Sequence, residues 1–77
     1  MSHRLNTIKL REVAAREGDL TDYQIARRSG LPRATLSRLV NGIGEPTIST
    51  LMRLSACYRV PVEALVREVG LDIALSA

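Results

Sequence analysis

The chain has 77 residues, 45% of them hydrophobic with no Trp and no Phe, which predicts one small domain with an aliphatic core. Its formal charge is +3, and this composition excludes both a disordered chain and a membrane protein, whose spans need about 20 consecutive apolar residues. A single cysteine, Cys57, excludes a disulfide scaffold, and the absence of a signal-peptide pattern leads us to expect a cytoplasmic protein.

Hydrophobic residues recur at helical spacing along nearly the whole chain, and no stretch alternates long enough to indicate a strand. The first predicted helix covers residues 6–17 and carries Leu10, Val13 and Ala14 on one stripe. The second covers residues 20–30. Thr21 and Gln24 have capping-box spacing at the start of this helix.

Three further helices are predicted after residue 31. The third covers residues 32–40 and ends at Asn41-Gly42, the fourth covers residues 47–57 behind a Thr47 cap, and the fifth follows Pro61 and ends at Gly70. Their apolar positions are Leu36, Leu39 and Val40; Ile48, Leu51, Met52, Leu54 and Ser55; and Val62, Leu65, Val66 and Val69. The chain is therefore expected to be an all-α, five-helix domain over residues 1–70, followed by a short apolar tail at 71–77.

The second and third helices have the features of a tight crossing. Ala26 is small where a second helix can pass over it, Gly30 tolerates positive φ in the turn four residues later, and Leu36 is an apolar anchor facing back. Leu31 is expected to seal the corner. An ordinary helical hairpin could use Ala and Gly in the same places.

The residues around this crossing carry further motifs. Residues 35–46 read TLSRLVNGIGEP, and residues 50–65 read TLMRLSACYRVPVEAL. Together with the crossing, these motifs resemble the helix-turn-helix domain of the Cro/C1 type (XRE family) of bacterial and phage DNA-binding regulators, over about residues 10–65. The resemblance implies a compact lambda repressor-like fold.

The resemblance also implies a recognition helix at residues 32–40, which lies in the major groove of DNA. With Leu36 and Leu39 directed inward, the family's base-reading positions fall on one outward strip. An Arg side chain fits guanine O6 and N7, so both arginines of the strip are predicted to prefer guanine, the alternative being that they only neutralise phosphates. The predicted base-contacting residues are Arg33, Ala34, Ser37 and Arg38.

Contacts to DNA phosphates are expected at the start of the second helix, whose amides attract anions, and after the third. The residues concerned are Thr21, Tyr23, Gln24, Asn41 and Gly44. Asn41 equally suits a left-handed helix end before Gly42.

Two positions depart from the family pattern. Asp22 stands where the family commonly has Gln, and its charge is expected to repel phosphate, so that neighbouring residues take over this contact. Val40 stands where the family usually has Glu, which often pairs with an Arg of the first helix. Apolar packing is expected to replace that ion pair. The loop before the second helix is also one residue longer than usual.

The basic residues lie mostly in the first half of the chain. Residues 1–42 hold eight basic and four acidic side chains, whereas residues 43–77 hold three and four. A polyanion-binding face would produce this asymmetry, although chance can produce it in so short a chain. Arg27 and Arg28 either reach DNA or simply complement the helix dipole.

The remaining side chains suggest no chemistry of their own. His3 lies at a terminus, Cys57 is expected to pack as a small hydrophobe, and Tyr58 is expected in the core. No nucleophile–base pair, phosphate loop or metal-ligand spacing is present. We therefore expect no enzyme activity, no cofactor and no metal.

The sequence predicts a transcriptional regulator, a repressor that binds a two-fold site on double-stranded DNA as a homodimer. The dimer surface is expected at the end of the chain, although the tail could equally pack on its own domain. Its apolar residues are Val62, Val66, Val69, Leu71, Ile73 and Leu75. The alternative is a protein-interaction module, either an antitoxin-like partner of a toxin or an adaptor to the transcription machinery, because one fold serves several functions.

Overall fold

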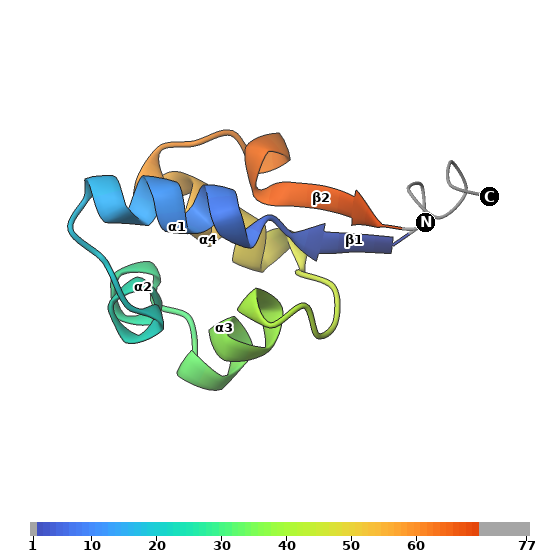
Figure 1. The fold of residues 1–77 in the computed structure, drawn as a ribbon, viewed down its shortest axis with the longest axis horizontal. Helices are drawn as coiled ribbons and strands as arrows, with labels where there is room; N and C mark the ends of the chain where they lie inside the picture. Colours follow the sequence, from blue (N-terminus) through green and yellow to red (C-terminus); the bar gives the residue numbers. More distant parts are fainter. Residues whose placement is uncertain (1, 70–77) are drawn as a thin grey trace.

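The computed structural model describes residues 2–69 and consists of helices with a small sheet at one end (Figure 1). In Figure 1, α2 and α3 lie below α1 and α4, and the two strands extend to the right. The predicted tail at 71–77 lies outside the described residues. The elements are β1 (Ser2–Leu5), α1 (Thr7–Arg16), α2 (Asp22–Ser29), α3 (Arg33–Val40), α4 (Ile48–Tyr58), a 3₁₀ turn (Val62–Leu65) and β2 (Val66–Val69).

The core is aliphatic, as the composition predicts. Each of the four helices and the 3₁₀ turn contributes one large, fully buried side chain to it, so every element is held by the same cluster. The five side chains are Leu10, Ile25, Leu36, Leu54 and Leu65.

The first three helices lie where the sequence predicts them, and local capping explains their ends. The Asn6 side chain accepts a hydrogen bond from the Lys9 amide at the start of α1 (3.1 Å). Thr21 and Gln24 form the predicted capping box at the start of α2. The end of α3 differs in detail, because Asn41 has a φ of −91° and Gly42 is the residue with positive φ.

Helix α4 begins after the predicted Thr47 cap, whose hydroxyl accepts a hydrogen bond from the Thr50 amide (3.1 Å). Its buried stripe follows helical spacing through Leu51, Leu54 and Tyr58. Two of its apolar positions are exposed instead, since Ile48 and Met52 retain 68% and 59% of their accessible surface.

The prediction of a fifth helix after Pro61 is wrong. The chain makes one 3₁₀ turn and then becomes β2, which pairs antiparallel with β1, with Leu5 opposite Val66 and Arg4 opposite Arg67. Val66 suits a strand because β-branched side chains pack well on a pleated surface, and it packs against the core. The pairing partner of β2 lies at the other end of the sequence, so helical spacing within one segment was misleading.

A buried polar cluster joins the loop before α2 to the end of α4. Asp19 is buried and accepts hydrogen bonds from the hydroxyl of Tyr58 (2.7 Å) and from the guanidinium of Arg28, which also donates to the Glu17 carbonyl (3.2 Å). Burial by itself raises the pKa of the Asp19 carboxyl, but the hydrogen bonds from Arg28 and Tyr58 and the charge of Arg28 together hold that pKa below its ordinary value. Arg28 therefore has a structural partner, and Tyr58 is in the core as predicted.

This cluster predicts a pH dependence of stability. Folding lowers the pKa of the Asp19 carboxyl below its ordinary value of 3.8. The ionised carboxylate therefore adds its full share to the stability of the fold above about pH 3.8, and this stability is lost as the pH falls through the lowered pKa. We expect Asp19→Asn to lower the melting temperature at neutral pH. The difference in melting temperature between this variant and the unmodified protein should become smaller below about pH 4. Thermal unfolding followed by circular dichroism measures this. Glu12→Gln, at an exposed carboxylate, is the control, and curves for Asp19→Asn that run parallel to those of the unmodified protein would contradict the assignment.

Candidate nucleic-acid interface

The predicted crossing of α2 and α3 is present. Ala26 is buried beneath the crossing, Gly30 ends α2 with a φ of 77°, and its amide donates to the Ala26 carbonyl (2.9 Å). Leu36 is fully buried, and half-buried Leu31 packs against the core at the corner. The sequence therefore folds here as a helix-turn-helix.

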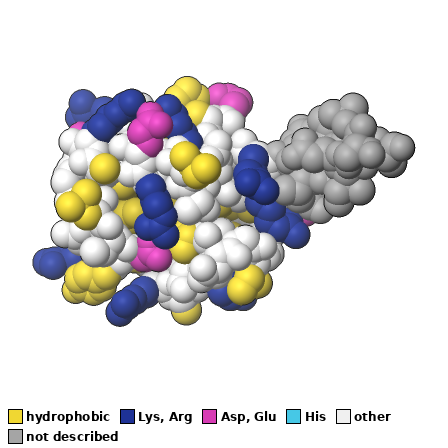
Figure 2. Space-filling model, in the orientation of Figure 1, with side chains coloured by type: hydrophobic (Ala, Val, Ile, Leu, Met, Phe, Trp, Pro, Cys, Tyr) yellow, Lys and Arg dark blue, Asp and Glu magenta, His cyan; other side chains and the backbone are white. Residues whose placement is uncertain are grey.

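The outer face of α3 carries the predicted base-reading side chains. Burial of Leu36 and Leu39 fixes the rotation of the helix, so the opposite strip faces solvent. Arg33, Ala34 and Arg38 are exposed, while Ser37 is half-buried. Figure 2 shows Lys and Arg side chains along the lower edge of the molecule, where α2 and α3 lie.

A contact between α2 and α3 was not visible in the sequence. The guanidinium carbon of Arg33 lies 5.7 Å from the centre of the Tyr23 ring, within the range of a cation–π interaction. Tyr23 is 52% exposed, and its closeness to Arg33 places the ring beside the outward strip. Spacing along the chain gives no signal for such a contact.

The start of α2 presents polar groups that are partly used by the helix cap. The Gln24 side-chain oxygen accepts from the amides of Leu20 (2.7 Å) and Thr21 (3.0 Å), and the Thr21 hydroxyl accepts from the Gln24 amide (3.2 Å). The Gln24 side-chain nitrogen and the Thr21 hydroxyl hydrogen are the donors that remain for a ligand.

The acidic departure at Asp22 is compensated. Arg11 of α1 lies 2.9 Å from the Asp22 carboxylate, so a cation accompanies this charge at the start of α2. The positive charge of Arg11 therefore offsets the negative charge of Asp22 and weakens the expected repulsion of phosphate.

The end of α3 brings Asn41 and Gly44 to the loop before α4, with both residues exposed. The side-chain amide nitrogen of Asn41 donates to the Ser37 carbonyl (2.8 Å), which leaves this nitrogen one hydrogen for another acceptor. The preceding Val40 packs against the core, as expected, and its carbonyl accepts from the Thr7 hydroxyl (3.3 Å). This bond ties the end of α3 to the start of α1.

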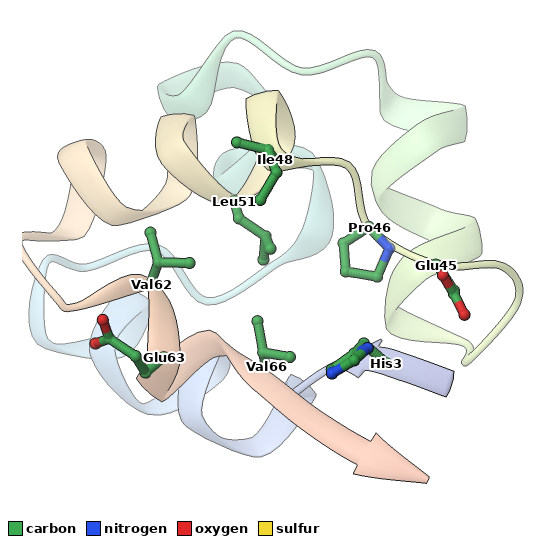
Figure 3. Close-up of a pocket in the computed structure, with 8 residues that line it drawn as sticks. All are labelled: His3, Glu45, Pro46, Ile48, Leu51, Val62, Glu63 and Val66. Atoms are coloured by element: carbon green, nitrogen blue, oxygen red, sulfur yellow. The ribbon is translucent and has the colours of Figure 1, made fainter. Parts of the chain in front are cut away.

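An apolar hollow of about 480 Å³ lies between α4, the 3₁₀ turn and the strands (Figure 3). Figure 3 shows Ile48, Leu51, Val62 and Val66 lining a shared space, with Glu45 and Glu63 at opposite ends. Ile48, one of the two exposed apolar residues of α4, lines this hollow.

The other candidate residues suggest no separate site. Cys57 is half-buried against the core, and burial raises the pKa of its thiol, which disfavours the reactive thiolate. Within residues 2–69 no group of His, Cys, Asp and Glu side chains is arranged to hold a metal ion. None of the helices in that range is long and apolar enough to cross a membrane.

Comparison with protein-family models matches residues 9–65 to the family described as Helix-turn-helix. The matched residues include α2, α3, α4 and the crossing, and all of α1 except its first two residues. No curated protein and no solved structure matches the chain.

Proposed function

Because the chain belongs to the helix-turn-helix family of the Cro/C1 type (XRE family), we propose that it is a sequence-specific transcriptional regulator that binds double-stranded DNA with α3 in the major groove. One observation carries this proposal: two arginines, Arg33 and Arg38, project from α3 opposite its buried residues. Arginine reads guanine through two hydrogen bonds. Ala34 and Ser37 complete the base-reading strip.

The DNA backbone is bound at both ends of the recognition unit in this proposal. Donors at the start of α2 hold one phosphate, and donors after α3 hold another, which fixes the orientation of α3 without reading sequence. The residues proposed for these contacts are Thr21, Tyr23, Gln24, Asn41 and Gly44.

The regulator is proposed to act as a repressor that occupies its operator as a homodimer. One such domain contacts few base pairs, and two-fold dimers bind half-sites about 34 Å apart. The hollow that Ile48, Val62 and Val66 line, together with the exposed Met52 of α4, supports a dimer surface in this region. Sedimentation at micromolar concentration measures the oligomeric state, and a persistent monomer would contradict the dimer.

The function is tested by selecting bound sequences from a random pool of DNA duplexes. A regulator recovers one motif with two-fold symmetry, and fluorescence anisotropy on that motif gives an affinity that falls steeply with salt. A scrambled duplex of equal length is the control. Equal binding of both duplexes would contradict a sequence-specific regulator. If the protein binds neither duplex, a protein-interaction module is favoured.

The ring of Tyr23 is predicted to support Arg33 in this complex. Tyr23→Leu is expected to weaken binding to the selected motif by about two- to fivefold, the loss expected for an exposed cation–π contact. Tyr23→Phe keeps the ring and loses only the hydroxyl proposed to contact phosphate, so anisotropy titrations should show a smaller loss of affinity than for Tyr23→Leu. If instead the two substitutions weaken binding equally, the hydroxyl rather than the ring makes the contact.

A further inference from the structure

Two arginines stand directly opposite each other in the sheet. The antiparallel register pairs Arg4 of β1 with Arg67 of β2. Directly opposed side chains on neighbouring strands lie on the same face, about 5 Å apart at their Cβ atoms, and like charges in this arrangement destabilise the sheet. Such a pair is an unfavourable feature of the free protein, and a bound anion would relieve it.

The existing contacts leave most of this positive charge available. Arg4 is half-buried; its guanidinium donates to the His3 carbonyl (3.1 Å) and lies 3.7 Å from the exposed Glu45 carboxylate, a long ion pair that contributes little. Arg67 is exposed, and none of the carboxylates between residues 3 and 67 pairs with it. Figure 2 shows Lys and Arg side chains gathered at the right-hand side of the body, where the strands lie.

Both arginines line one hollow, of about 370 Å³, that reaches the end of α3. Thr7, Asn41 and Gly42 line the same hollow, and the Thr7–Val40 hydrogen bond holds its two sides together. An anion here would meet two guanidinium groups and the remaining hydrogen of the Asn41 amide.

We propose that Arg4 and Arg67 bind a phosphate of the DNA backbone where the duplex passes the C-terminal end of α3. The proposal rests on the function proposed above, because α3 in the major groove brings a phosphate strand past its end. It extends the contact already proposed for Asn41 onto the sheet, whose strands lie outside the matched residues 9–65. The contact reads no sequence, so it strengthens binding to every duplex alike.

The test compares Arg4→Gln and Arg67→Gln with Arg59→Gln, which removes an equal charge at the end of α4. Anisotropy titrations are run from about 50 to 200 mM salt on the selected motif and on a scrambled duplex. Each of the first two substitutions is expected to weaken binding to both duplexes by a similar factor. Loss of one phosphate contact should also reduce the slope of log affinity against log salt by about one, which Arg59→Gln should not do.

Two further measurements locate the contact and separate it from folding. Shortening the duplex stepwise from its ends removes the flanking phosphate, and beyond that point Arg67→Gln should cause no additional loss. The melting temperature of DNA-free Arg67→Gln should be unchanged or higher, because like-charge repulsion is removed. A salt slope for Arg67→Gln equal to that of Arg59→Gln overturns the site while leaving the regulator intact. If the unmodified protein binds no duplex, both proposals fall.

Discussion

Replacement of Leu36 by alanine is expected to lower the free energy of unfolding by about 3 kcal/mol, within the range for truncation of a buried leucine. Leu36 is 0% exposed and anchors α3 to the core beside the crossing at Ala26 and Gly30. The close approach of the two helices leaves little freedom for neighbours to fill the cavity. At roughly 0.05–0.15 kcal/mol per residue, a domain of this length has little stability to spare.

Urea unfolding followed by circular dichroism measures this loss as a shift of the midpoint. Leu20→Ala is the matched control, because the same atoms are removed from a side chain that is 73% exposed, and its effect should stay below about 0.5 kcal/mol. Leu36→Met, which nearly conserves volume, should cost less than about 1.5 kcal/mol. Equal midpoints for Leu36→Ala and Leu20→Ala would show that Leu36 does not anchor α3.

The helices and the crossing were predictable because their signals are local. The Thr21–Gln24 capping box and the Gly30 turn each act within four residues, so their spacing in the sequence reports their geometry directly. The buried and outward faces of α3 followed from helical periodicity alone. Burial of Leu36 then placed Arg33 and Arg38 outward without knowledge of the rest of the fold.

The sheet was not predictable in this way. The apolar residues at 62, 65, 66 and 69 have the spacing of a helical stripe, and only the pairing of β2 with β1 decides in favour of a strand. That pairing joins segments about sixty residues apart, so no window of the sequence contains both partners. Arg4 and Arg67 face each other only because of this strand register, so their pairing could not be predicted from the sequence either.

Contacts between elements were also invisible to local reasoning. Arg11 compensates Asp22 across two helices, and the Tyr23 ring lies beside Arg33 across the turn. Asp19 belongs to no motif in the sequence, yet it accepts a hydrogen bond from a tyrosine 39 residues later. To predict such contacts, one needs to know the angle at which the helices cross and how each helix is rotated about its axis. The spacing of residues in the sequence specifies neither.

Substitution of Arg38 by alanine is expected to weaken binding to the selected motif by about 10- to 100-fold, the discrimination that one bidentate arginine–guanine pair provides. Arg38 lies in the last turn of α3 and is exposed, with its carbonyl accepting from the Ile43 amide (2.9 Å), so its backbone is held while its side chain is free to reach a base. Arg33→Ala should have a similar effect at a different base pair.

The decisive measurement is a set of anisotropy titrations against every single-base variant of the motif. If Arg38 reads a base, the unmodified protein discriminates at that base pair and Arg38→Ala no longer does, while discrimination at all other positions is retained. Arg16→Ala on α1 is the control, because Arg16 pairs with Glu12 outside the strip and its loss should leave the pattern unchanged. Uniform weakening by Arg38→Ala across all variants would instead identify Arg38 as a phosphate contact, because a side chain that reads no base cannot change the ranking of sequences.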